Sequence, residues 1–239
     1  MIFFNPLFWA FMLPSMILGF IAQAAVQARF RKYSEVGVTR RLTGAQAARE
    51  ILDSHSLYDV RIEEAPGGQL SDHYDPRSRV LRLSPEVGRV SSVAAIGVAA
   101  HEAGHAIQHA NNYFPLQFRS ALVPAVSFGS QLAPLIIIGG ILLQALFRLV
   151  QFGAIVAWFG VLVYGLIALF SLITLPVELD ASARAKKLLY QYNIVDQREL
   201  GGVSSVLNAA ALTYVAAALA ALGQLAYWIL ILTGGSRRD

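Results

Sequence analysis

Cysteine is absent from the 239 residues of this chain. Its absence excludes disulfide bonds, thiol nucleophiles and metal sites with thiolate ligands. The same absence is compatible with a reducing compartment, where disulfides are rare. The chemistry of the chain therefore has to come from other side chains.

Charged residues are missing from four long stretches of the sequence. No Asp, Glu, Lys or Arg occurs before Arg29, between Arg119 and Arg148, between Arg148 and Glu178, or between Glu199 and Arg237. Each stretch is longer than the roughly 20 apolar residues with which a helix crosses a bilayer. Because a helix satisfies its own backbone polar groups in lipid, four such stretches indicate a multi-pass membrane protein.

The four stretches predict four transmembrane helices. We place them near Phe3–Gln23, Leu122–Phe147, Phe152–Leu175 and Val206–Thr233. A cleaved signal peptide is the alternative for the first segment. It is disfavoured because the segment has no basic start and no clear small-x-small cleavage site. Two prolines in the first segment, Pro6 and Pro14, do not forbid a spanning helix.

Basic residues are distributed unevenly around the predicted spans. They follow the first span directly, at Arg29, Arg31, Lys32, Arg40 and Arg41, and recur after the third, at Arg184, Lys186, Lys187 and Arg198. The positive-inside rule then places the N-terminus outside and residues 29–120 in the cytoplasm, with Arg237 and Arg238 as a minor violation. Basic runs beside spans indicate membrane anchoring rather than binding of nucleic acid. We expect an integral protein of the inner or plasma membrane.

The polar stretch 29–120 predicts a small α+β unit. Its expected elements are a helix near 44–54 with a capping box at Thr43 and Gln46, a strand at 58–62, turns at 66–68 and 75–78, a strand at 80–83, a helix opening at 84–86, and a helix from Ser91 or Ser92 to about Ala110. The last helix is apolar almost all round, which is typical of a buried helix. It nevertheless contains two histidines and a glutamate.

His101 and His105 are four residues apart in that helix, with Glu102 between them. This spacing puts both rings on one helix face, where they can bind one zinc ion. Glu102 is rotated off that line and can act as a base for water activated by the metal. The pattern is HExxH, and a shuffled chain would contain it with a chance of roughly 0.4%. The alternative, three polar residues satisfied inside a helix, is disfavoured because burying them without partners is costly.

A catalytic zinc ion usually has a third protein ligand. His109 lies about 12 Å along the helix from His101, too far to share one metal with it. His55 and His73 are possible ligands. The best candidate is Glu178, because it ends the third span and a pair of spans returns the chain to the side of the two histidines. An ordinary interfacial charge is the alternative for this carboxylate.

Four blocks of the sequence resemble the YugP-type family of membrane zinc metallopeptidases. These blocks are LSDHYDP at residues 70–76, VLRLS at 80–84, GVAAHEAGHAIQH at 97–109 and LPVELDAS at 175–182, and the resemblance covers nearly the whole chain. It implies a membrane-embedded zinc peptidase with zinc on His101 and His105 and with Glu102 as the base.

The chain is similar, more distantly, to membrane gluzincins of the HtpX and CAAX-prenyl-protease type. Those proteins carry a third-ligand Glu that is followed four residues later by Asp. Glu178 matches that Glu, whereas Ser182 stands at the fourth position. Asp180 or Ser182 can then orient a histidine ring. The alternative for Asp180 is an i,i+4 pair with Arg184.

The sequence as a whole predicts a mainly α, multi-pass membrane protein, with four transmembrane helices and a small zincin-like cytoplasmic α+β part. The expected domains are 1–28 (first span), 29–120 (cytoplasmic, with the HExxH helix), 121–176 (second and third spans), 177–204 (cytoplasmic helix with the third zinc ligand) and 205–239 (fourth span and tail).

The expected function is zinc-dependent cleavage of membrane or membrane-proximal proteins. We expect the strand at Val80–Leu83 to bind substrate at a sheet edge, or to be plain core, and His73, Tyr74 or His109 to stabilise the oxyanion. The rival hypothesis is a scaffold or chaperone-like protein with structural zinc, which would not need Glu102 as a base. A metal transporter is disfavoured because the spans lack ionisable residues.

Overall fold

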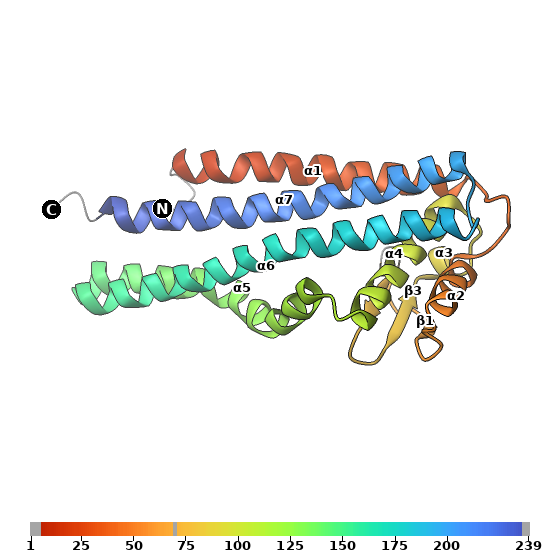
Figure 1. The fold of residues 1–239 in the computed structure, drawn as a ribbon. Helices are drawn as coiled ribbons and strands as arrows, with labels where there is room; N and C mark the ends of the chain where they lie inside the picture. The colour runs from red at the N-terminus through yellow and green to blue at the C-terminus, as the bar shows by residue number, and fades with distance from the viewer. Residues whose placement is uncertain (1–5, 69–70, 236–239) are drawn as a thin grey trace. The chain divides into compact units, whose positions relative to one another are not determined.

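The computed structural model describes residues 6–68 and 71–235. Figure 1 shows the elements, which are α1 (Pro6–Ser34), α2 (Gly44–Ser54), β1 (Arg61–Glu64), β2 (His73–Asp75), β3 (Val80–Leu83), α3 (Pro85–Gly88), α4 (Val93–Ala110), α5 (Phe114–Phe147), α6 (Val150–Gln191) and α7 (Gln197–Gly235). The start of the first predicted span at Phe3, Leu70 of the LSDHYDP block, and Arg237 and Arg238 lie outside the described residues.

In the part of the chain that the structure describes, four helices are long and apolar enough to cross a membrane, namely α1, α5, α6 and α7. The predicted fold class, mainly helical with four membrane-spanning helices and a small sheet, is therefore confirmed. Each helix also continues beyond its apolar stretch, and α6 runs past Glu178 to Gln191. The end of an apolar stretch does not end a helix when the following residues, such as Ala181 to Lys187, favour helix as well.

The chain divides into two compact units. Residues 1–20, 118–175 and 214–239 form the first, here called the apolar unit, and residues 21–117 and 176–213 form the second, here called the site unit. All four long helices contribute residues to both units. Each unit is described below by itself.

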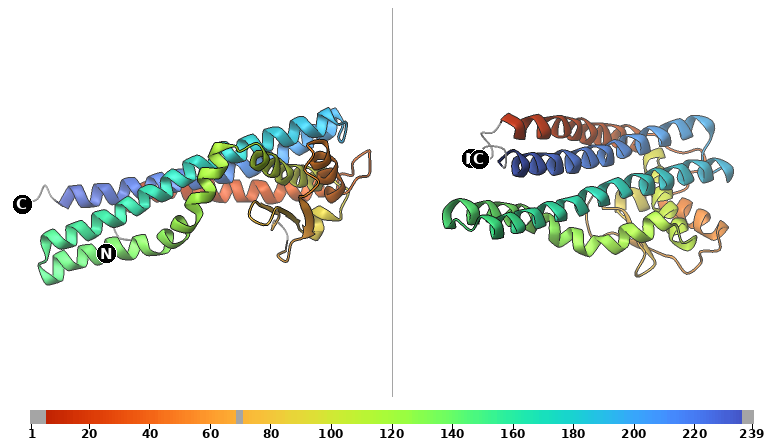
Figure 2. Two further views of the ribbon diagram at one scale, coloured as in Figure 1. Left: turned by 60° about the horizontal axis from the view of Figure 1, so that its bottom comes forward. Right: turned by 60° about the vertical axis from the view of Figure 1, so that its left-hand side comes forward.

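Glycines bring helices close together in the apolar unit. α5 and α6 lie side by side and antiparallel, joined by a short connection (Figures 1 and 2). At their contact, a Cβ on Gly140 would lie 2.5 Å from the backbone nitrogen of Ala157, and one on Gly160 would lie 3.0 Å from that of Ile137. Small residues of this kind allow close backbone approach between helices in membranes.

The site unit is built around α4, which is buried along most of its length. Ser92 caps α4, and its side chain accepts a hydrogen bond from the Ala95 N–H, as the sequence predicts. α2 occupies the predicted residues, and the capping box between Thr43 and Gln46 is confirmed. α2 approaches α4 closely at Gly44, where a Cβ would lie 3.0 Å from the Ala95 carbonyl oxygen.

The first strand is displaced from its predicted position. β1 begins at Arg61, so the prediction of a strand from Tyr58 was wrong for its first three residues. The guanidinium of Arg49 donates hydrogen bonds to the carbonyl oxygens of Leu57 (2.8 Å) and Val60 (2.7 Å). These bonds hold residues 57–60 as a loop against α2. The alternating apolar and polar pattern of these residues therefore does not indicate a strand.

The sheet has the strand order β1-β3-β2, with β1 parallel and β2 antiparallel to β3. The prediction that Val80–Leu83 forms a sheet edge for substrate was therefore wrong, because β3 is the central strand and is paired on both sides. β2 was not predicted at all. It has only three residues, too few for a periodic signal, and the turn at 76–79 folds it back onto β3.

Candidate metal and catalytic site

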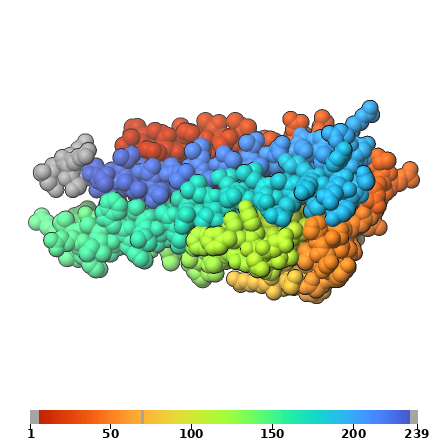
Figure 3. All heavy atoms as spheres, in the orientation of Figure 1, coloured from red at the N-terminus to blue at the C-terminus, as the bar shows by residue number. Residues whose placement is uncertain are grey.

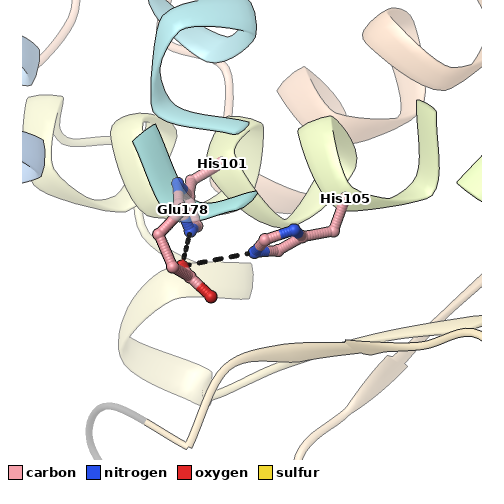
Figure 4. A group of neighbouring side chains, drawn as sticks. All are labelled: His101, His105 and Glu178. Atoms are coloured by element: carbon pink, nitrogen blue, oxygen red, sulfur yellow. Dashed lines mark hydrogen bonds and ion pairs between the residues drawn. The ribbon is translucent and has the colours of Figure 1, made fainter. Parts of the chain in front are cut away.

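Three side chains converge in the site unit from two helices (Figure 4). His101 and His105 stand one turn apart on α4, with ring centroids 4.8 Å apart, and Glu178 reaches them from α6. Glu178 Oε2 lies 3.1 Å from His101 Nε2 and 3.5 Å from His105 Nε2. Within the described residues, these three form the one group of His, Asp or Glu side chains whose ligand atoms are close enough to hold a metal ion.

A close backbone approach holds α4 against α6 at this group. A Cβ on Gly104 would lie 2.8 Å from the carbonyl oxygen of Ala181. Ala181 lies between Glu178 and Ser182 on the buried face of α6. The glycine of the HExxH segment thus lets the two helices meet where the histidines and the carboxylate need to converge.

The far nitrogen of each imidazole also has a partner. His101 Nδ1 lies 3.1 Å from the Ser182 hydroxyl, and His105 Nδ1 lies 2.9 Å from Gln108 Oε1. These contacts leave both Nε2 atoms directed at Glu178. Histidines that bind metals are commonly held by a second polar group in this way.

The chemistry of the donor atoms fits a cation. Because Gln108 Oε1 can only accept, His105 Nδ1 carries a proton, and the ring presents a lone pair at Nε2 whenever it is neutral. This lone pair faces a carboxylate oxygen of Glu178 that is almost fully buried, at 3% exposed. When the ring is neutral, its lone pair and the Glu178 carboxylate need a positive charge between them, which a metal ion would supply.

The distances from Glu178 Oε2 to the two histidine nitrogens also fit zinc. Ligand bonds of 2.0–2.1 Å in a tetrahedral arrangement put neighbouring ligand atoms about 3.3 Å apart. The two nitrogen-to-oxygen distances, 3.1 and 3.5 Å, lie on either side of that spacing. Two imidazoles and one carboxylate are a known ligand set of catalytic zinc, so the residues present fit this ion.

Glu102 lies beside the group without belonging to it. Its Oε2 accepts a hydrogen bond from the backbone N–H of Tyr74 in β2, at 3.0 Å. Burial raises the pKa of the Glu102 carboxyl above its ordinary value, against the opposing effect of His101 and His105. The strand that the sequence did not predict thus fixes the carboxylate expected to serve as the base.

The other histidines are engaged elsewhere. His55 Nδ1 lies 3.0 Å from the Ile51 carbonyl oxygen, and His73 Nδ1 lies 2.8 Å from the Ser71 carbonyl oxygen. Both were possible third ligands, and neither belongs to the group of side chains that could hold a metal ion. His109 Nδ1 lies 2.9 Å from the hydroxyl of Tyr74, so two of the oxyanion candidates are paired with each other.

Asp180 makes the i,i+4 pair with Arg184 that the sequence offered as one alternative, and it is linked to a histidine ring only through Gln108. Its Oδ2 accepts a hydrogen bond from Arg184 Nε at 2.6 Å, the predicted i,i+4 pair. The same oxygen accepts from Gln108 Nε2 at 2.8 Å, and Gln108 contacts His105. Sequence reasoning missed Gln108, whose only signal was its position three residues after His105 on the same helix.

Together these observations define a class, a helical protein with membrane-spanning helices and a His-His-Glu group that could hold a metal ion. A sequence profile of the family described as "Putative neutral zinc metallopeptidase" matches residues 8–233, and the chain belongs to this family. The chain is 45% identical over 218 residues to the "Putative membrane protease YugP" of Bacillus subtilis (strain 168), covering 91% of this chain and 93% of that protein. The family resemblance seen in the sequence is therefore confirmed. No solved structure matches the chain significantly.

Proposed function

We propose that the chain is a membrane-bound zinc endopeptidase of the HExxH gluzincin type, which cleaves membrane or membrane-proximal proteins. The observation that carries the proposal is the convergence of His101 Nε2, His105 Nε2 and Glu178 Oε2, with the Glu102 carboxylate beside them. Family membership supports the zinc peptidase class. The geometry supports these particular residues.

In this proposal, His101, His105 and Glu178 hold the zinc ion. Zinc in this position would supply a Lewis acid that polarises a peptide carbonyl and acidifies water. Ser182 and Gln108 hold the two rings with their Nε2 atoms inward. A structural zinc site usually has four protein ligands, whereas the described group has three, which favours catalysis over the scaffold alternative.

Glu102 is the proposed general base and acid. It takes a proton from the water that attacks the peptide carbonyl, and it returns this proton to the nitrogen as the carbon–nitrogen bond breaks. The raised pKa of the Glu102 carboxyl suits this double role. A carboxyl whose pKa is shifted toward neutral pH both accepts and releases a proton readily. The N–H of Tyr74 keeps the carboxylate in place during both transfers.

The proposed substrates follow from the position of Glu178. It comes directly after the charge-free stretch of α6, within the same continuous helix. With a rise of about 1.5 Å per residue, the metal-binding group then lies within a few ångströms of the end of that stretch along the helix axis. Protein segments at or near the bilayer surface are therefore the substrates we propose.

The cytoplasmic location of the site remains part of the proposal. The basic residues after α1 and in the later part of α6 support it through the positive-inside rule. Because the chain has no cysteine, a single His55→Cys substitution provides a clean label site. We expect a membrane-impermeant thiol reagent to label it only after the cells are permeabilised. Labelling in intact cells would reverse the orientation.

Zinc content and cleavage of an unfolded protein such as casein, measured on purified full-length protein, test the mechanism. Glu102→Gln should retain zinc while cleavage falls by about 10²–10⁴-fold, the usual contribution of a general base. His101→Ala and Glu178→Ala should lose zinc and cleavage together.

Matched controls lie in the same unit. His55→Ala and Glu86→Ala remove the same side-chain types at positions outside the metal-binding group, and both should keep zinc and activity. Cleavage by Glu102→Gln at the wild-type rate would contradict the proposed base. Full zinc affinity in Glu178→Ala would contradict the proposed third ligand.

A further inference from the structure

Gln108 is a fully buried polar side chain whose amide orientation is determined by its surroundings. Its Nε2 lies 2.8 Å from the Val177 carbonyl oxygen and 2.8 Å from Asp180 Oδ2. Both of these atoms can only accept hydrogen bonds, so the amide nitrogen has to face them. The amide oxygen is left to face His105 Nδ1, at 2.9 Å.

This orientation decides the tautomer of His105. An amide oxygen has no proton to give, so it accepts from Nδ1–H, and in the neutral ring the lone pair is then on Nε2, the atom that faces Glu178. His101 is held differently. Its Nδ1 contacts the hydroxyl of Ser182, which can donate or accept and therefore permits either tautomer.

Asp180 stabilises the orientation of the Gln108 amide by accepting a hydrogen bond from its nitrogen. Its Oδ2 accepts from Gln108 and from Arg184, and the guanidinium of Arg184 lies over the ring of Tyr113, 5.9 Å from the ring centre. Figure 3 shows the chain around the α4–α5 junction in contact with α6 on the surface of the site unit. The Asp180 carboxylate is thus held in place by the guanidinium of Arg184.

We infer that Gln108 is the positioning residue that sets the metal-binding tautomer of His105, and that Asp180 acts on the site through Gln108. The inference rests on the proposed function, because it assigns a role toward the zinc ion that the three ligands would hold. It adds two residues of this chain to that function, one from each of the two helices that form the site.

Zinc affinity of the full-length protein, measured by competition with a chelator, tests the inference without relying on activity. Gln108→Leu keeps a similar volume but removes the acceptor, and we expect its affinity to fall by about 10–100-fold, as for other residues that orient metal ligands. Gln117→Leu is the matched control, since Gln117 is exposed and its amide nitrogen contacts Asn112. It should bind zinc like the wild type.

A pair of substitutions separates positioning from simple packing. Gln108→Glu keeps an acceptor for His105 but sets a second carboxylate against Asp180, so affinity should fall. Adding Asp180→Asn supplies an N–H in place of the repelling carboxylate, and we expect it to recover about tenfold of the lost affinity. This rescue is expected only if donor and acceptor roles matter, and it decides the question even if Gln108→Leu fails to fold.

The outcomes distinguish the inference from the function on which it rests. Wild-type affinity in Gln108→Leu, or no recovery in the paired variant, would overturn the role of Gln108 while leaving the zinc site intact. Zinc that remains bound in both His101→Ala and Glu178→Ala would instead overturn the proposed function itself.

Discussion

The apolar unit and the site unit place the same residue types in opposite ways. In the apolar unit, large side chains such as Phe128, Ile155 and Leu162 are exposed over 67–72% of their surface. In the site unit, comparable side chains such as Ile51 and Leu81 are fully buried. A contiguous exposed apolar surface is unfavourable in water and neutral in lipid, so the two units are suited to different solvents.

Polar side chains differ between the units as well. In the apolar unit, the hydroxyl groups of Ser171 and Thr174 donate hydrogen bonds to carbonyl oxygens one turn earlier in the same helix. In the site unit, polar groups join different elements, as Glu199 does when it accepts from the N–H and hydroxyl of Thr39. The buried charged residues His105, Glu102 and Glu178 thus lie in the unit where polar partners from several elements are available.

Arginine substitutions, one in each unit, are expected to give the largest difference between the units. Leu162 and Tyr190 both lie on α6 and are 67% and 54% exposed, the first in the apolar unit and the second in the site unit. Leu162→Arg should disfavour insertion of this span by about 2.5–3.5 kcal/mol, because the arginine would have to enter hydrocarbon. Glycosylation reporters on either side of the span measure the effect.

Tyr190→Arg is the matched control, and it should leave insertion unchanged because we expect its surroundings to be aqueous. Equal effects of the two arginines would show that the exposed apolar surface does not face lipid. The contrast between the units would then need another explanation.

The second-largest effect is expected from a glycine substitution that disturbs the packing of the site unit. Gly104→Ala places a methyl group 2.8 Å from the Ala181 carbonyl oxygen, so α4 and α6 must separate. We expect a loss of about 1–3 kcal/mol in the stability of the site unit, as for other overpacked positions, together with weaker zinc binding. Thermal melting of the zinc-free protein and chelator competition measure the two effects.

Gly201 in α7 offers the comparison, because a Cβ added there meets no atom within 4 Å. Gly201→Ala should leave zinc affinity unchanged and stabilise the helix by about 0.5–1 kcal/mol. Unchanged zinc binding in Gly104→Ala would mean that the α4–α6 approach does not set the geometry of the site.

The features that sequence could predict are those with a local cause. The four long helices follow from stretches without charge, and the start of α2 follows from a capping box between residues three apart. The convergence of Glu178 on His101 and His105 could also be anticipated, since a pair of spans returns the chain to one side. In each case the deciding residues are neighbours in sequence or are constrained by the bilayer.

The features that escaped prediction depend on contacts between distant residues. Whether residues 57–60 form strand or loop is decided by Arg49, which lies on another element. The central position of β3 depends on β2, which is too short to show a period and is held by Glu102 and by pairing with β3. The role of Gln108 likewise depends on Val177 and Asp180, about 70 residues away in the sequence.

The smallest predicted effect concerns a local feature and should remain confined to the site unit. The Thr43 hydroxyl accepts from the Gln46 N–H, and the Gln46 side chain accepts from the Thr43 N–H. Thr43→Ala should destabilise α2 by about 1 kcal/mol, as for other lost N-caps. Hydrogen exchange of the first α2 amides should then be about fivefold faster. Thr43→Ser keeps the hydroxyl and should exchange nearly like the wild type. Since α2 packs on α4 through Gly44, faster exchange in α4 as well would show that the site unit opens as one cooperative body. A change limited to α2 would instead show that α4 is stabilised separately.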